Sequence, residues 1–262
     1  MSITSSDATY RVPPVPLQYV PETYHAGVFG NFEHSVLRRI DALRAEASWL
    51  NDEKVRFFEY LLQQVDFEKY GALQDRYLNP PIARGCLKYL DPVSWFEHKF
   101  HYAHLLKLHE APPLRILDLG AGPGHFLVIA RFYGHTAIGT ELPIERTELD
   151  HPSHFYSELS AIYGNWLIPH RIEPNRKLAG IPSEVDLITA FSVAFNLSRG
   201  SLWEIPQWKI FLGGLKDEIL VPGGKLFMSL MNRKMEPEVW AYLTERSSQY
   251  SERERHILID RL

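Results

Sequence analysis

The chain has 262 residues, of which 45% are apolar, and its 28 Lys and Arg against 32 Asp and Glu give a net charge of −4. This composition excludes a disordered chain, and the lack of a basic domain disfavours a nucleic-acid partner, because Lys and Arg contacts to phosphate dominate such binding. The single cysteine excludes an internal disulfide, no apolar run is long enough to span a membrane, and the first residues do not resemble a secretory signal, so we expect a cytoplasmic protein with no membrane partner.

The N-terminal part is predicted to be an irregular arm followed by helices. Four prolines between positions 13 and 21 indicate that residues 1–30 are irregular, because proline fixes φ and removes a hydrogen-bond donor. Residues 31–110 show apolar positions at helical spacing. Asn51 is expected to cap one helix, and Asp91-Pro92 is expected to begin another that runs to about His109.

From position 114 onward, short apolar runs alternate with amphipathic segments. This alternation predicts an α/β fold with a mainly parallel sheet and helices on both faces. Strands are expected at 114–119, 136–142, about 169–173, 185–191, 225–230 and around 257–259. Helices are expected at about 124–133, 151–163 and 237–250, and along the apolar face that includes Trp208 and Ile219.

A glycine loop, Gly120-Ala121-Gly122-Pro123-Gly124, connects the first of these strands to the first of these helices. Glycines at such a turn let the backbone approach a ligand closely, and the helix N-terminus favours an anionic group. His125 stands where the dinucleotide fingerprint G-x-G-x-x-G needs its last glycine, and no Gly-Lys-Ser/Thr follows. The loop therefore fits neither that fingerprint nor a P-loop.

Two carboxylates accompany the loop. Asp118 lies two residues before the first glycine, and Glu141 lies 17 residues after Gly124, at the expected end of the second strand. A carboxylate at that place can accept hydrogen bonds from both hydroxyls of a ribose. Asp-x-Gly-x-Gly-x-Gly followed by an acidic residue that ends the second strand resembles the class I S-adenosylmethionine-dependent methyltransferases.

The resemblance covers roughly residues 114–230. Residues 185–191 are similar to the fourth strand of that family, and residues 220–226 to the turn into its fifth strand. A segment in the preceding helix, Asp91–Phe100, resembles a group of uncharacterised bacterial methyltransferases, which supplies no substrate. The resemblance implies a Rossmann-like catalytic domain over 111–262, with the helical region 31–110 as a lid over the substrate.

The resemblance also implies that S-adenosylmethionine is the cofactor. The residues that would bind it are Asp118, Gly120, Ala121, Gly122, Gly124, Glu141, Leu142, Glu173 and Phe191. Asp118 would lie near the cofactor's amino group, Glu141 would hold the ribose and Leu142 would lie against the adenine. One of the pair Ile172-Glu173 would flank the adenine's edge, although Glu173 is equally compatible with an exposed surface position. Phe191 would pass close to the methionine moiety.

Methyl transfer from a sulfonium is an in-line displacement, so the protein mainly aligns the acceptor and excludes water. A general base is needed only if the acceptor begins protonated. Three residues are candidates for contacting the acceptor or accepting its proton: His98, His125 and Asn196. Each also fits a structural role, and the histidines at 98, 101 and 104 do not form a clear ligand set, so no metal is expected.

The leading hypothesis is a methyltransferase that acts on a small or medium-sized metabolite. The alternatives are an RNA or protein methyltransferase and a catalytically silent scaffold partner, while a nicotinamide dehydrogenase is disfavoured by His125. Only 12 residues follow Tyr250, enough for one strand where the family has an antiparallel hairpin. We therefore expect an incomplete hairpin whose edge a second copy of the chain would cover, giving a homodimer.

Overall fold

A computed structural model describes most of the chain. The described residues are 31–46, 48–78, 88–143, 152–193, 195, 203–230, 236–251 and 256–262. The predicted arm at 1–30 and the candidate Asn196 lie outside these residues. Among the helices in the described ranges, none has the length and apolar character needed to cross a lipid bilayer.

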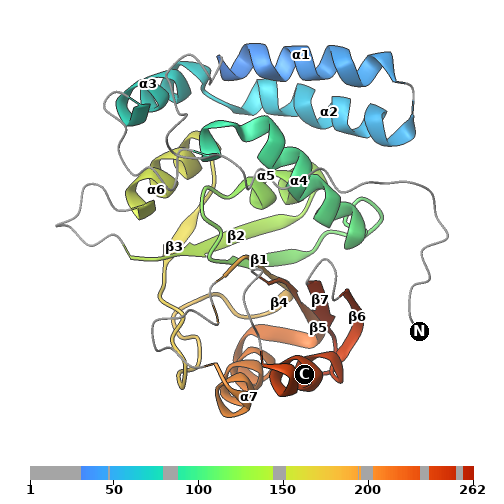
Figure 1. Ribbon diagram of the computed structural model, residues 1–262, viewed down its shortest axis with the longest axis vertical. Coiled ribbons are helices and arrows are strands. Elements are labelled where there is room, and N and C mark those ends of the chain that lie inside the picture. Colours follow the sequence, from blue (N-terminus) through green and yellow to red (C-terminus); the bar gives the residue numbers. More distant parts are fainter. Residues whose placement is uncertain are drawn as a thin grey trace.

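The core of the protein is a seven-stranded sheet, as the alternating pattern predicted (Figure 1). Its strand order is β3-β2-β1-β4-β5-β7-β6, and all neighbouring pairs from β3 to β5 are parallel, whereas β7 runs antiparallel to both β5 and β6. The strands are β1 (Arg115–Leu119), β2 (Thr136–Glu141), β3 (Leu167–Pro169), β4 (Val185–Phe191), β5 (Leu220–Ser229), β6 (Ser247–Ser251) and β7 (His256–Ile259).

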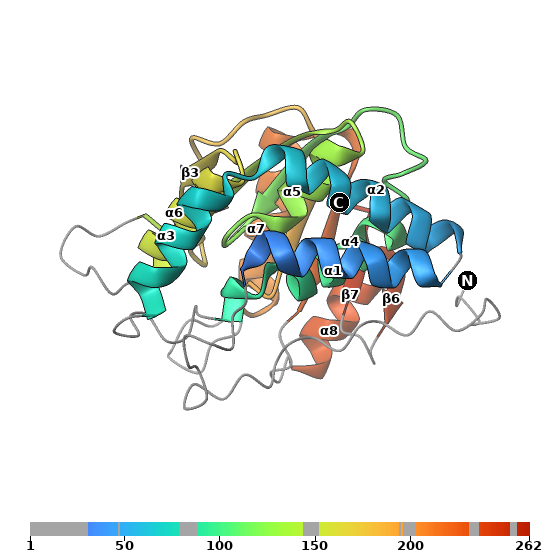
Figure 2. The ribbon, with the colours of Figure 1, turned by 90° about the horizontal axis from the view of Figure 1, so that it is seen from above.

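Helices cover both faces of this sheet. They are α1 (Phe32–Ala45), α2 (Trp49–Gln64), α3 (Phe67–Leu78), α4 (Pro92–Leu105), α5 (His125–Phe132), α6 (Pro152–Ile162), α7 (Ile205–Gly214) and α8 (Pro237–Thr244), with a π-helical turn at Leu215–Ile219 after α7. Helices α1 and α2 pack side by side and lie outside α4 and α5, so this side of the sheet has two layers of helix (Figures 1 and 2).

Successive strand residues point to opposite faces, and this alternation divides the core in two. Ile116 and Leu187 join a cluster built with residues of α1 to α6, whereas their neighbours Leu117 and Ile188 join a cluster built with α7, its π-helical turn and α8. The helical N-terminal region therefore shares one continuous apolar core with the sheet. Within that region, α1 to α3 form the outer layer, in which α1 packs on α4 and α3 packs on α6.

The C-terminal hairpin is complete, so the expectation of a missing strand was wrong. The helix expected over 237–250 ends at Thr244, and residues 247–251 form β6 instead. Its pairing with β7 supplies the antiparallel hairpin. The homodimer was expected only because an edge was thought to be incomplete, and that reason no longer holds.

Two further boundaries differ from the sequence prediction. Strand β3 occupies 167–169 rather than 169–173, so Ile172 and Glu173 follow the strand instead of ending it. The residue that caps α2 is Ser48, whose hydroxyl accepts a hydrogen bond from the Asn51 backbone N–H at 3.2 Å. Asn51 lies inside the helix, and its amide donates back to the Glu46 carbonyl at 2.6 Å.

Candidate functional site

The strand order reverses between β1 and β4, which are neighbours although β2 and β3 intervene in sequence. In open α/β sheets, ligands bind outside the carboxyl ends of the strands at such a switch point. Here β1 ends at Leu119 and leads into the glycine loop, and β4 ends at Phe191. The predicted loop residues and Phe191 are therefore brought together at this edge of the sheet.

The loop needs glycine for its backbone conformation and for space. Gly120, Gly122 and Gly124 have φ angles of +62°, +55° and +78°, in the left-handed region that side chains disfavour. A Cβ on Gly124 would lie 2.3 Å from the Asn165 amide nitrogen, and one on Gly120 would lie 2.9 Å from a Val193 methyl group. The three glycines therefore let the chain turn sharply from β1 into α5.

The end of β2 holds the loop in place. The Ala121 N–H donates to the Thr140 carbonyl at 2.8 Å, and the Gly120 N–H donates to the Thr140 hydroxyl at 3.1 Å. Glu141 accepts from the Gly122 N–H through Oε2 at 2.7 Å and from the Leu142 N–H through Oε1 at 2.9 Å. Glu141 thus orients the loop directly, a role that the spacing argument missed.

Asn165 also holds the loop in place, and no sequence motif pointed to this residue. Its side-chain amide donates to the carbonyls of Pro123 at 3.2 Å and Gly124 at 3.1 Å, while its Oδ1 accepts from Arg131 at 2.5 Å. The residue follows α6 and precedes β3. It joins the end of α6 to the start of α5, so that the position of the loop depends on both helices.

Asp118 is buried at the carboxyl end of β1 and faces a lysine from α4. It is 2% exposed and accepts a hydrogen bond from the Thr189 hydroxyl of β4 at 2.8 Å. Burial raises the pKa of Asp118, while the nearby Lys99 ammonium acts in the opposite direction. Burial likewise lowers the pKa of Lys99 against the attraction of Asp118. The Lys99 ammonium lies 3.6 Å from the ring centroid of Phe191.

Sequence reasoning missed Lys99, although the helix contained a signal for it. Lys99 lies four residues after Trp95 and three residues before Tyr102, so the three side chains share one face of α4. Both aromatic residues are buried, which makes Lys99 the charged residue in an apolar stripe. The ring of Tyr102 lies 5.1 Å from that of Phe191, so this face of α4 is directed at the end of β4.

His98 lies on the side of this stripe. It is 6% exposed, and its ring meets those of Trp95 and Tyr102 edge to face at 6.0 and 5.1 Å. Burial, with help from the charge of Lys99, lowers the pKa of His98 to about 3, so the imidazole is neutral at pH 7. Its buried Nδ1 has no hydrogen-bond partner among the described residues.

His125, the first residue of α5, is enclosed by aromatic rings. It is 2% exposed, and its ring lies 4.8 Å from Phe96 and 5.4 Å from Tyr163. Burial lowers the pKa of His125 to about 3, and its Nε2 has no partner in the described part of the chain. These surroundings are those of a core residue that packs α5 against α4.

The predicted adenine contacts are spread over two segments. Leu142 follows β2 and is 39% exposed, which leaves its side chain accessible beside Glu141. Glu173 lies four residues beyond the end of β3 and forms an ion pair with Arg176 at 2.6 Å. Ile172 packs against the apolar cluster on the α7 side of the sheet. Glu173 therefore forms a surface ion pair in this structure.

Comparisons with known proteins return structural likenesses only. No protein-family model matches the chain, and no curated protein does. Among solved structures, the ribosomal protein L11 methylase of Lactobacillus delbrueckii subsp. bulgaricus is 20% identical, with a TM-score of 0.41 over 63% of this chain and 79% of that one. CalS10, an amino pentose methyltransferase of Micromonospora echinaspora, is 19% identical, with a TM-score of 0.38 over 55% of this chain and 52% of its own.

TrmN of Thermus thermophilus is 24% identical, with a TM-score of 0.33 over 50% of this chain and 37% of its own length. The assignment of the fold rests on the topology itself. The sheet has the order 3-2-1-4-5-7-6 with an antiparallel seventh strand, and a left-handed glycine loop joins the first strand to the helix that follows it. With this strand order and this loop, the chain has the class I methyltransferase fold.

Proposed function

We propose that the protein is an S-adenosylmethionine-dependent methyltransferase whose acceptor is a small or medium-sized metabolite. The observation that supports this most directly is the left-handed glycine loop at the switch point of the sheet, with the buried Asp118 just before it and Lys99 of α4 over the neighbouring Phe191. A buried charge needs a partner of opposite sign. The amino-acid end of S-adenosylmethionine carries one charge of each sign, and it matches such a pair.

The residues fit the cofactor in the following way. Asp118 would accept hydrogen bonds from the cofactor's ammonium group, and Lys99 of α4 would approach the cofactor's carboxylate. Gly122 leaves room along the loop, since nothing lies within 4 Å of the place where its Cβ would be. Glu141 would accept hydrogen bonds from the ribose hydroxyls, and the exposed Leu142 would lie against the adenine.

When bound, the cofactor supplies an activated methyl group on a sulfonium sulfur. The chain's own residues would hold the acceptor in line with it and keep water out. His98 is neutral at pH 7, and its buried Nδ1 has no hydrogen-bond partner among the described residues, so it could contact the acceptor, although its lowered pKa makes it a weak base. Of the helical N-terminal region, α4 contributes these groups, and we propose that it acts as the lid.

The charge pair is tested with two ligands that differ only at the amino-acid end. S-adenosylhomocysteine carries that end, and 5′-methylthioadenosine lacks it. In calorimetric titrations we expect Lys99→Met and Asp118→Asn to lower the affinity for S-adenosylhomocysteine by about tenfold or more, since hydrogen bonds to charged groups contribute about 1.5–3 kcal/mol. Binding of 5′-methylthioadenosine should stay within about twofold.

Replacement of an exposed lysine, Lys69→Met, serves as the control and should leave both affinities unchanged. A wild-type protein that binds neither S-adenosylmethionine nor S-adenosylhomocysteine would overturn the proposed function. If Lys99→Met lowered the affinity for both ligands equally, only the assignment of Lys99 to the amino-acid end of the cofactor would be lost.

The ribose contact needs its own test, because Glu141 also holds the loop. Wild-type protein should bind adenosine more tightly than 3′-deoxyadenosine, since a site built to hydrogen-bond a hydroxyl rejects an analogue without it. In Glu141→Gln this preference should shrink, whatever happens to the absolute affinities. A preference that is the same in both proteins would show that Glu141 serves the loop alone.

The acceptor is identified by methyl transfer from labelled S-adenosylmethionine. Label should appear in a pool of small metabolites and not in RNA or protein fractions incubated in parallel. Transfer to RNA or protein would replace the metabolite with that class of acceptor. Tight cofactor binding without transfer to any of the three would favour the silent scaffold.

A further inference from the structure

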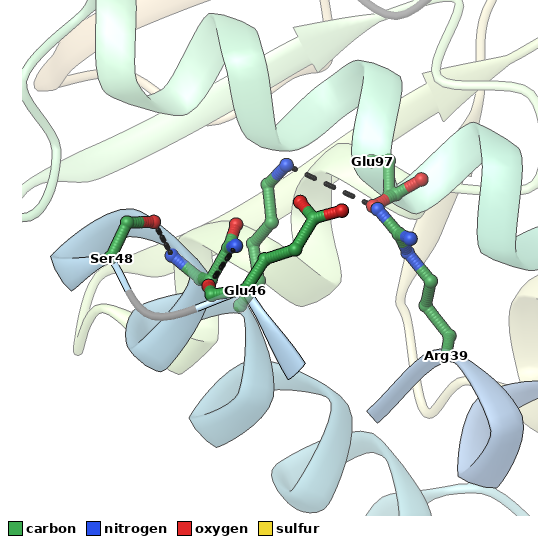
Figure 3. A network of polar contacts seen from close by, with 6 residues as sticks. Arg39, Glu46, Ser48 and Glu97 are labelled. Atoms are coloured by element: carbon green, nitrogen blue, oxygen red, sulfur yellow. Dashed lines mark hydrogen bonds and ion pairs between the residues drawn. The ribbon is translucent and has the colours of Figure 1, made fainter. Parts of the chain in front are cut away.

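A partly buried ion network joins the outer helices to α4. The Arg39 guanidinium of α1 donates two hydrogen bonds to Glu97 Oε1, at 2.8 Å from Nε and 2.5 Å from Nη2 (Figure 3). The Lys54 ammonium of α2 lies 3.8 Å from the same oxygen. Glu97 belongs to α4, so one carboxylate oxygen is shared by three helices.

Two of the three side chains in this network are more buried than those of an ordinary surface pair, whereas Arg39 is 35% exposed. The side chains of Glu97 and Lys54 are 14% and 8% exposed, and burial lowers the pKa of Lys54 against the attraction of Glu97. Removing such charges from water is costly, and apolar residues of similar size are often as stable or more so. Stability alone therefore does not explain these charges. By contrast, Arg44 and Glu59, which join α1 to α2, form an exposed pair with 57% and 44% exposure.

The position of Glu97 on α4 relates the network to the candidate site. An α-helix turns by about 100° per residue, so Lys99 projects about 200° around the axis from Glu97. Glu97 faces α1 and α2, whereas Lys99 lies over Phe191 on the sheet side of the helix. A rotation of α4 about its axis would displace both groups at once, and two hydrogen bonds to one guanidinium define a direction as well as a distance.

We propose that Glu97 is a positioning residue: held by Arg39 and Lys54, it fixes the rotation of α4 and so keeps the Lys99 ammonium in place beside Asp118 for the amino-acid end of the cofactor. This inference rests on the proposed function. It assigns to the outer helical layer a role in cofactor binding without any contact to the cofactor.

The test separates positioning from stability. The triple variant Arg39→Met/Lys54→Met/Glu97→Leu replaces the network with apolar side chains and should unfold at a temperature equal to or above that of the wild type. It should nevertheless bind S-adenosylhomocysteine roughly 3- to 30-fold more weakly, the range seen for residues that act on a site from a distance. Binding of 5′-methylthioadenosine should stay within about twofold, because it has no group for Lys99.

Glu97→Gln should show the same selective loss and covers the case in which the triple variant fails to fold. The matched control is Glu59→Gln, which breaks the exposed pair with Arg44 and should change neither ligand's affinity. If Lys99→Met selectively lowers the affinity for S-adenosylhomocysteine but the Glu97 variants do not, the positioning role is overturned and the proposed function stands. If the wild type binds neither ligand, the proposed function itself fails.

Discussion

At the scale of single residues, Gly124 has the strictest requirement in the loop, because it needs both a left-handed backbone and empty space. We expect Gly124→Ala to weaken S-adenosylhomocysteine binding at least tenfold and to lower the free energy of unfolding by about 1–3 kcal/mol, the range for a strained backbone position. The new Cβ would displace the Asn165 amide and with it the clamp on the loop. Calorimetry and urea unfolding measure the two effects.

Gly180 provides the control for this substitution. Its φ is +72°, close to that of Gly124, but nothing lies within 4 Å of its Cβ position. Gly180→Ala should therefore cost stability through backbone strain alone and leave ligand affinity unchanged. A Gly124→Ala protein that binds as tightly as Gly180→Ala would show that the space beside Asn165 does not matter.

The candidate site was predictable from sequence where a residue acts through its own place in a strand or loop. The glycines, Asp118 and Glu141 follow from spacing, because the carboxyl ends of parallel strands meet at one edge. Lys99 and Asn165 were missed for a common physical reason. Each reaches the loop or strand from a helix or turn that packs there only in the folded chain, so that tertiary packing determines its contacts.

At the scale of elements, the start of α2 shows how one side chain selects a boundary. Ser48 is extended, with φ −156° and ψ 151°, and its hydroxyl accepts the Asn51 N–H. Figure 3 shows this bond at the helix start. Ser48→Ala leaves that N–H without its side-chain partner and should destabilise the protein by about 1 kcal/mol.

Thermal and urea unfolding would measure this cost, and affinity for S-adenosylhomocysteine should not change. Asn51→Ala is the comparison, because the sequence pattern favoured Asn51 as the cap. That change removes only a bond to the Glu46 carbonyl, and its cost should be smaller than that of Ser48→Ala. The reverse order of the two costs would contradict the capping assignment.

The elements that were misplaced owe their structure to distant partners. Residues 247–251 continue an amphipathic helical pattern, but they pair with β7 and complete the edge of the sheet. Strand β3 has three residues and is ordered by β2, which it joins from Gly139↔Leu167 to Glu141↔Pro169. Short continuous apolar runs identified the central strands because these are buried on both faces, whereas edge strands carry a weaker pattern.

At the scale of the whole molecule, buried histidines are concentrated on the side of the sheet that carries α1 to α6. His98 and His125 are each at most 6% exposed. The buried Nδ1 of His98 and the buried Nε2 of His125 have no hydrogen-bond partner among the described residues. Their rings pack with aromatic residues of α4 and with Tyr163, which follows α6, and burial there favours their uncharged form. The layer that holds the proposed lid is therefore the part of the protein most sensitive to acid.

This arrangement predicts how stability depends on pH. The pKa values of His98 and His125 are lowered to about 3 in the folded protein, from 6.5 in the unfolded chain. Between about pH 3 and 6.5 the unfolded chain therefore binds more protons, and each histidine makes the free energy of unfolding fall by up to about 1.4 kcal/mol per unit decrease in pH. The raised pKa values of Glu53 and Asp118 act in the opposite direction and reduce the net slope.

The contribution of one histidine is isolated by comparing how steeply the free energy of unfolding depends on pH, rather than its value at one pH. Urea unfolding between pH 5 and 7 should give His125→Gln a shallower pH dependence than the wild type, even if the variant is less stable at pH 7. Phe155→Leu, in the same apolar cluster, should lower stability equally at every pH because it removes no titratable group. A slope in His125→Gln equal to that of the wild type would mean that this histidine has the same pKa in the folded and the unfolded chain, and the core would then have to accommodate its charge at low pH.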